Sequence, residues 1–160
     1  MDDLPIIIRA ATAADIPELV PLYVAYRVFY GEPAAADAAL EFIRDRIERG
    51  ASKYFLAWNR SFSAVGRTSP PVAFMHLMPS TNTLAMRPIW LLEDLYVEPA
   101  FRNRGLAASL LSHAEAFARA TGAERITLST ARDNHAAQRI YEKLGYLRED
   151  HFWYFHRILS

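Results

Sequence analysis

Apolar residues recur at helical spacing in four segments of the chain. The clearest segment runs from Arg104 to Thr121, where one helical face carries Leu106, Leu110, Ala114, Phe117 and Thr121. A glycine follows three of these segments, as is common where a helix ends; these glycines are Gly50, Gly122 and Gly145. We therefore expect helices over about residues 15–30, 34–49, 104–121 and 135–144.

β-Branched and alternating apolar residues between these helices predict strands. They cover about residues 4–10, 53–58, 72–78, 84–97, 125–130 and 152–158. The Ser-, Gly- and Pro-rich residues 59–71 predict a hairpin loop, and Arg87-Pro88 a loop or bulge. The resulting order, β-α-α-β-β-β-α-β-α-β, predicts an α/β sandwich with a mixed central sheet of six to seven strands and helices on both faces.

The composition narrows the possible functions. The 160 residues suit one domain covering positions 1–160, and 18 basic against 18 acidic residues give zero net charge. A neutral chain has no general attraction for nucleic acid or anionic membranes, and no apolar stretch approaches the length of a membrane span. The first residues, Met-Asp-Asp-Leu-Pro, lack the basic start of a signal peptide, so we expect a cytoplasmic protein.

Cysteine and histidine usage limits the chemistry further. The chain has no cysteine, which excludes disulfides, thiolate metal ligands and a cysteine nucleophile. The five histidines are scattered without a recognisable ligand spacing, so no metal site is expected.

The segment from Leu91 to Ala107 predicts an anion site. A strand ends at Pro99, a short basic loop follows, and a long helix begins. The first N–H groups of a helix have no acceptor within the helix, and the helix dipole makes them attractive to an anion. Arg102 and Arg104 add positive charge, and Gly105 allows the backbone to approach the anion closely.

Two blocks of sequence resemble the GCN5-related N-acetyltransferase (GNAT) superfamily. Residues 102–107, Arg-Asn-Arg-Gly-Leu-Ala, resemble its Arg/Gln-x-x-Gly-x-Gly/Ala motif. Residues 134–146, Asn-His-Ala-Ala-Gln-Arg-Ile-Tyr-Glu-Lys-Leu-Gly-Tyr, resemble its Asn-x-x-Ala-x-x-x-Tyr-x-x-x-Gly-Phe/Tyr motif. The blocks stand in the family's order with one predicted strand between them, and the resemblance covers roughly residues 9–158. It implies the GNAT-type α/β/α sandwich.

The resemblance also implies acetyl-coenzyme A as cosubstrate and suggests which residues bind it. The backbone of Leu95, Tyr96 and Val97 would pair with the pantetheine arm and polarise the thioester carbonyl. The pyrophosphate would be held by the segment Arg102, Asn103, Arg104, Gly105, Leu106 and Ala107. Asn134 would contact the pantetheine arm, although its position also suits a simple helix N-cap.

Acetyl transfer to an amine needs a proton acceptor and a proton donor, and the resemblance points to one residue for each. Tyr141 is the expected general acid, lying beside the cofactor, because a phenol pKa near ~10 suits proton return to a thiolate. Glu93 is the expected base, acting through a water. Asp94 would face the opposite way in a regular strand. The alternative for both carboxylates is a structural role in salt bridges or caps.

The acceptor pocket is expected from the first helix and the Glu93-Asp94 pair. Tyr26, Arg27 and Tyr30 would line it, and the carboxylates suit a cationic acceptor. These features resemble the polyamine and small-amine branch, which implies a primary amine of a polyamine, diamine or amino acid as acceptor. A protein N-terminal or lysine acetyltransferase and a non-catalytic acyl-CoA-binding module are the alternatives.

One further segment bears on assembly. The aromatic run at residues 152–155 is larger than one small core needs, and part of it could form a surface that pairs with a second subunit. Together with the frequency of dimers in the superfamily, it predicts a homodimer.

Overall fold

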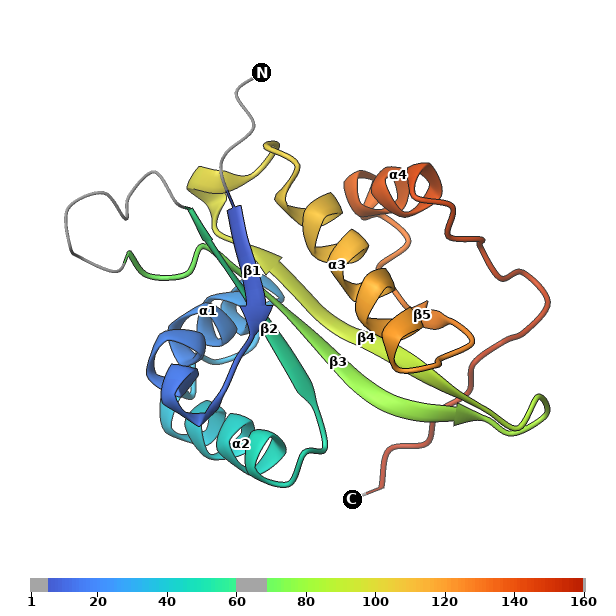
Figure 1. Ribbon diagram of the computed structural model, residues 1–160, viewed down its shortest axis with the longest axis horizontal. Coiled ribbons are helices and arrows are strands. Elements are labelled where there is room, and N and C mark those ends of the chain that lie inside the picture. Colours follow the sequence, from blue (N-terminus) through green and yellow to red (C-terminus); the bar gives the residue numbers. More distant parts are fainter. Residues whose placement is uncertain (1–5, 60–68, 160) are drawn as a thin grey trace. The chain divides into compact units, whose positions relative to one another are not determined.

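The computed structural model describes residues 6–59 and 69–159 (Figure 1). The chain divides into two compact units, the first ending at Ser129 and the second beginning at Thr130. Most of the predicted hairpin loop at residues 59–71 lies outside the described residues.

The first unit contains the sheet and three of the α-helices. Its elements in chain order are β1 (Ile6–Ala10), the 3-10 turn η1 (Ala13–Asp15), α1 (Ile16–Phe29), α2 (Ala36–Glu48), β2 (Lys53–Asn59), β3 (Ala73–Asn82), β4 (Arg87–Val97), the 3-10 turn η3 (Pro99–Phe101), α3 (Leu106–Ala120) and β5 (Ile126–Leu128). The second unit contains the short helix α4 (His135–Lys143). All four predicted helices are therefore present, each within a few residues of its expected bounds.

The strands of the first unit form one mixed sheet in the order β1-β2-β3-β4-β5. Neighbours from β1 to β4 are antiparallel, whereas β4 and β5 are parallel. A parallel pair needs a crossover, and α3 supplies it between β4 and β5.

The expected count of six to seven strands was wrong, because the sheet has five among the described residues. The predicted last strand at residues 152–158 is irregular chain, and its aromatic side chains from Phe152 to Phe155 are between 71% and 94% exposed. Apolar density alone does not make a strand, since a strand exists only where its backbone pairs with a neighbour. The homodimer expected from this run stays a prediction.

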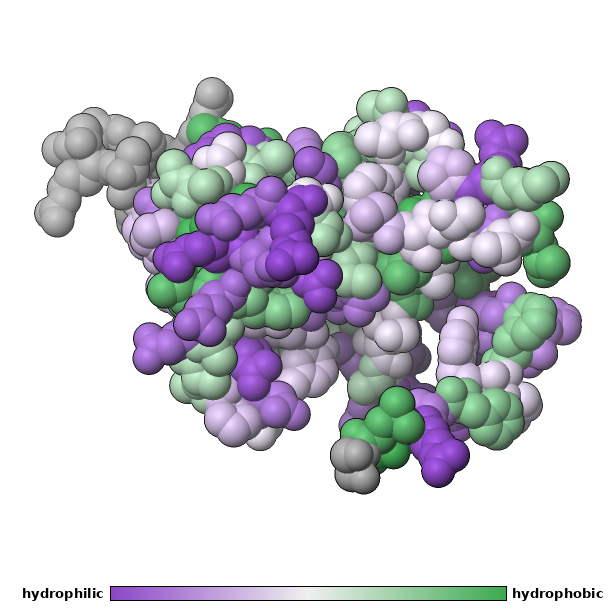
Figure 2. Space-filling view, turned by 90° about the horizontal axis from the view of Figure 1, so that it is seen from below, coloured by the Kyte–Doolittle hydropathy of each residue, from purple (hydrophilic) through white to green (hydrophobic). Residues whose placement is uncertain are grey.

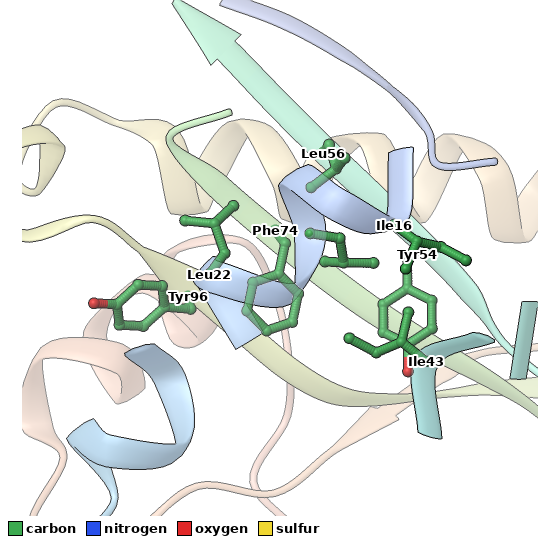
Figure 3. Packing of buried hydrophobic residues seen from close by; sticks show 8 residues of the cluster. Ile16, Leu22, Ile43, Tyr54, Leu56, Phe74 and Tyr96 are labelled. Carbon is green, nitrogen blue, oxygen red and sulfur yellow. The ribbon is translucent and has the colours of Figure 1, made fainter. Parts of the chain in front are cut away.

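The two faces of the sheet are covered by different helices. On one face, α1 and α2 bury Leu22 and Ile43 against Tyr54, Leu56 and Phe74 of the sheet (Figure 3). On the other face, Phe117 of α3 packs against Phe55 and Trp90, with ring centroids 5.1 and 5.0 Å apart. Because side chains alternate along a strand, the neighbouring residues Tyr54 and Phe55 point to opposite faces, Tyr54 to the face covered by α1 and α2 and Phe55 to the face covered by α3.

Surface properties agree with the balanced composition. Figure 2 shows hydrophilic and hydrophobic residues side by side over one face of the molecule. Within the described ranges, no helix is both long and apolar enough to cross a membrane.

A buried carboxylate fixes the entry from β1 into α1. Asp15 accepts hydrogen bonds from the Thr12 N–H and hydroxyl at 2.8 and 2.9 Å. It also accepts two from the Arg9 guanidinium, at 2.6 and 2.8 Å, and the same guanidinium lies 4.4 Å from the centroid of the Trp58 ring. The Arg9 contact holds the pKa of the Asp15 carboxyl well below its usual range.

We expect Asp15→Asn to lower the free energy of unfolding at pH 7 by about 1–3 kcal/mol, the cost of losing charge-assisted hydrogen bonds. The folded-state pKa lies below the unfolded value of about 3.9, so this contribution is complete above that value and is lost as pH falls further. Urea denaturation at pH 7 and pH 3 should show the gap between wild type and variant narrowing.

Asp45→Asn is the matched control. Asp45 pairs with Arg49 one helical turn away, and its side chain is 49% exposed. An exposed pair of this kind contributes on the order of 0.5 kcal/mol or less. Equal effects of the two substitutions would contradict a special role for Asp15.

Candidate active site

A β-bulge interrupts strand β4 at Glu93. His76 of β3 lies opposite Asp94, but the next residue, Leu77, lies opposite Leu92, so Glu93 is the extra residue. A bulge of this kind changes which side chains a strand directs to each face. The regular strand assumed from the sequence is therefore not present at this point.

The bulge places Asp94 on the face covered by α1 and α2. Trp90 packs against α3, and Leu92, two residues later, belongs to the same face. Without the bulge Asp94 would follow them. Instead it lies opposite His76, which in turn lies opposite Tyr54 of the α1–α2 core. One inserted residue thus moves the carboxylate from one side of the sheet to the other.

Asp94 is the outer end of a polar chain that runs into the sheet. Its Oδ2 atom lies 2.7 Å from Nδ1 of His76, and Nε2 of His76 lies 2.8 Å from the Ser52 hydroxyl oxygen. The Tyr54 ring stacks on the imidazole, with centroids 4.3 Å apart. Ser52 and His76 are buried, whereas the Asp94 side chain keeps 14% exposure. Of these three hydrogen-bonded side chains, the Asp94 carboxylate is therefore the one that solvent can reach.

Tyrosines of α1 lie close to this carboxylate. The Tyr26 hydroxyl lies close enough to Asp94 to interact with its carboxylate, and the Tyr26 ring packs edge-on against Phe74 and Tyr96. Burial, with the Asp94 charge as the next cause, raises the pKa of Tyr26 and of Tyr23. Both phenols consequently stay protonated at neutral pH and present aromatic faces and hydroxyl groups beside a negative charge.

The other residues expected at the acceptor pocket have different surroundings. Arg27 donates from Nε to the Pro33 carbonyl at 3.2 Å and lies 3.8 Å from Glu32, so its guanidinium is engaged just beyond the end of α1. Tyr30 packs edge-on against Tyr26 but is 53% exposed. Glu93, at the bulge, is also exposed.

The bulge also marks where β4 separates from β5. The two strands pair from Trp90 to Leu92 only, so among the described residues 93–97 have β3 as their single neighbouring strand. Beyond the strand, the Glu98 N–H donates to the Val72 carbonyl on the β3 side, at 2.9 Å. By alternation, the backbone groups of Leu95 and Val97 lie on the free edge of β4, where no described strand pairs with them and the Val97 carbonyl accepts a hydrogen bond from Arg102. This edge suits an extended ligand that can add to a strand.

The loop after β4 delivers the start of α3 to the predicted anion site. Asn103 and Gly105 both have positive φ, 59° and 80°, and α3 begins at Leu106. The first N–H groups of the helix lack acceptors within it and lie next to Arg104, which is exposed. A Cβ atom on Gly105 would meet nothing within 4 Å, so its positive φ, and not crowding, calls for glycine.

The Arg102 side chain contacts the end of β4 and two aromatic rings. Its Nε donates to the Val97 carbonyl at 2.9 Å, and its guanidinium lies over the rings of Phe29 and Tyr96, 5.0 and 5.5 Å from their centroids. The side chain therefore connects the end of α1 to the end of β4.

In the second unit, Asn134 caps α4. Its side-chain oxygen accepts from the Ala137 N–H at 3.2 Å, which confirms the N-cap interpretation. Tyr141 lies on the same helix, with its ring 5.9 Å from that of Tyr146. The expected contacts of Asn134 and Tyr141 with the cofactor stay predictions.

Sequence reasoning missed His76 and Ser52. Nothing in the local sequence distinguishes His76 from a histidine buried in a strand, because its partner Asp94 is set by the β3–β4 register and by the bulge.

Among the described residues, no group of three or more His, Asp and Glu side chains is arranged to hold a metal ion.

Comparisons with known proteins agree with this geometry. The model of the acetyltransferase (GNAT) family matches residues 18–146. An uncharacterized N-acetyltransferase of Bacillus subtilis (strain 168), YhfO, is 32% identical over 91% of this chain and 92% of its own length. A solved structure of a probable acetyltransferase is 33% identical, with a TM-score of 0.85 over 96% of this chain and 98% of that one.

More distant relatives extend the comparison. An aminoglycoside N(6')-acetyltransferase of Acinetobacter genomosp. 13 is 24% identical over 77% of this chain and 82% of its own. The fold of the aminoglycoside N-acetyltransferase AAC(6')-Iy, solved with CoA, is similar, with a TM-score of 0.75 over 95% of this chain and 94% of that one at 19% identity. The chain thus belongs to the acetyltransferase (GNAT) family and is an acetyl-CoA-dependent N-acetyltransferase.

Proposed function

We propose that the protein transfers the acetyl group of acetyl-CoA directly to a primary amine of a small cationic molecule, such as a polyamine, a diamine or an amino acid. The observation that carries this proposal is the Asp94 carboxylate beside the tyrosines of α1, since a negative charge among aromatic rings favours an ammonium group. The aminoglycoside acetyltransferases among the relatives are named for acceptors that also carry several amino groups.

We assign cofactor binding to two features of the first unit. The free edge of β4 at Leu95 and Val97 would take the pantetheine arm, and the amides from Gly105 to Ala107, with Arg104, would take the pyrophosphate. Acetyl-CoA supplies an acetyl group activated as a thioester. Oriented amides contribute typically about 3–4 kcal/mol when they stabilise charge that develops on a carbonyl oxygen.

Side chains of the protein would accept one proton from the acceptor amine and donate one to the leaving sulfur. The acceptor arrives as an ammonium ion and must lose a proton before its nitrogen can attack; Glu93 or Asp94 would accept that proton. As the new N–C bond forms and the C–S bond breaks, the Tyr141 phenol would give its proton to the departing sulfur. The acylated nitrogen would release its second proton to the solvent, and Tyr141 would recover a proton from the solvent.

The first experiment is an acceptor panel with purified protein and acetyl-CoA. The panel contains spermidine, 1,5-diaminopentane, lysine, kanamycin and a peptide with a free N-terminus, and thiol release reports turnover. We expect the small di- and polyamines to give the highest kcat/KM. A clear preference for the peptide would replace the proposal with N-terminal acetylation, and cofactor binding without turnover would indicate a non-catalytic module.

Tyr141→Phe tests the general acid. We expect kcat to fall roughly 10²-fold or more, because a positioned acid contributes about that factor, while the Kd of acetyl-CoA changes little. Single-turnover kinetics and calorimetry measure the two quantities. Tyr154→Phe is the matched control: this tyrosine belongs to the same unit, is 86% exposed, and should retain wild-type kcat. An active Tyr141→Phe variant would exclude Tyr141 as the acid.

Gly105→Ala tests the pyrophosphate loop. With φ at +80°, an alanine strains the backbone by roughly 1–2 kcal/mol, and we expect the Kd of acetyl-CoA to rise about fivefold or more as the loop relaxes. Gly122→Ala is the control, since Gly122 has a φ of +72° at the opposite end of α3 and should lower stability alone. Equal calorimetric Kd values for the two variants would rule out the assigned loop.

A further inference from the structure

We propose that His76 is a positioning residue that holds Asp94 as the ammonium-binding carboxylate of the acceptor site, an inference that rests on the proposed acetyl transfer to an amine. The chain of contacts runs from Ser52 through His76 to Asp94, at 2.8 and 2.7 Å. Its two inner members are buried, and Asp94 is the member that a ligand can reach.

The hydrogen-bond chemistry sets the direction of this chain. An ionised carboxylate only accepts hydrogen bonds, so Nδ1 of His76 carries the proton and donates it to Asp94. In the neutral imidazole Nε2 is then an acceptor, which suits donation from the Ser52 hydroxyl. Stacking on Tyr54 fixes the plane of the ring. The carboxylate is therefore held in one orientation by its buried neighbours.

The surroundings of Asp94 suit a cation. The Tyr26 hydroxyl contacts it from α1, and its charge also acts on the nearby phenol of Tyr23. Burying a polar chain in a sheet has a desolvation cost that apolar residues of similar volume would avoid. A purely structural role does not explain why the protein retains this desolvation cost. Holding a carboxylate in a fixed orientation for an incoming ammonium group does explain it.

Two isosteric substitutions of His76 separate positioning from packing. The amide nitrogen of Asn reaches the place of Nδ1, so His76→Asn keeps a donor to Asp94. The amide of Gln extends to the place of Nε2, so His76→Gln keeps a partner for Ser52 and loses the donor to Asp94. Each variant is assayed with the panel amine, small molecule or peptide, that wild type acetylates best.

We expect His76→Gln to raise the KM of the amine on the order of tenfold or more, with the KM of acetyl-CoA unchanged. His76→Asn and Ser52→Ala should stay within about threefold of wild type, because the Asp94 contact survives in both. Asp94→Asn should show a loss at least as large as that of His76→Gln. The matched control is His113→Gln on α3, where the ring packs against Phe55, 5.0 Å away, on the other face of the sheet.

Equal effects of His76→Gln and His76→Asn, or a parallel rise in the KM of acetyl-CoA, would overturn the inference. Thermal unfolding identifies a variant that does not fold. For that case, the imidazole ¹⁵N resonances of His76 in wild-type protein with CoA should shift when the amine is added, and unchanged resonances would also overturn it. If the wild-type protein prefers the peptide, the proposed small-molecule acceptor is wrong, but the role of His76 is not yet refuted. The KM values of the His76→Gln and His76→Asn variants for that peptide then test the role of His76.

Discussion

The arrangement of the candidate site depends on the single extra residue in β4. Side chains along a strand point alternately to its two faces, and an inserted residue reverses the face to which each following side chain points. Before the bulge, Trp90 faces α3; after it, Asp94 and Tyr96 face α1 and α2. At the same point β4 loses β5 as a neighbour, which leaves backbone groups free on its edge. One local irregularity therefore provides both a carboxylate on the face covered by α1 and α2, where we propose that the acceptor binds, and an unpaired strand edge, to which we propose that the cofactor adds.

The stable part of the fold supports this irregularity from both sides. Tyr54 contacts the imidazole of His76 while belonging to the core that α1 and α2 form with the sheet. Phe117 of α3 packs against Phe55 and Trp90 on the other face, next to the point where β4 and β5 still pair. A bulge held between two packed layers has little freedom to shift its register, which is what a preorganised site requires.

Elements that depend on local signals were predicted well from the sequence. The apolar spacing of α3 and the glycine after it predicted that helix to within two residues, and Asn134 was correctly assigned as a possible cap of α4. The last strand failed because an aromatic run indicates burial without supplying a partner strand. His76 and Asp94 could not be paired in advance, since 18 residues separate them and their contact depends on a register that the bulge alters.

The position of Arg102 has a consequence for how the loop would attract a phosphate. Its guanidinium contacts the Val97 carbonyl and two aromatic rings, so in the proposed site much of the attraction would come from oriented backbone amides and from Arg104. Mobile ions screen exposed side-chain charges strongly but affect close dipoles much less. The part of the attraction that comes from the amides would then change little with ionic strength, whereas the part that comes from the exposed Arg104 would weaken as salt rises. The attraction of a polycationic acceptor to exposed carboxylates would also weaken as salt rises. Salt would therefore affect binding of the acceptor more than binding of the cofactor.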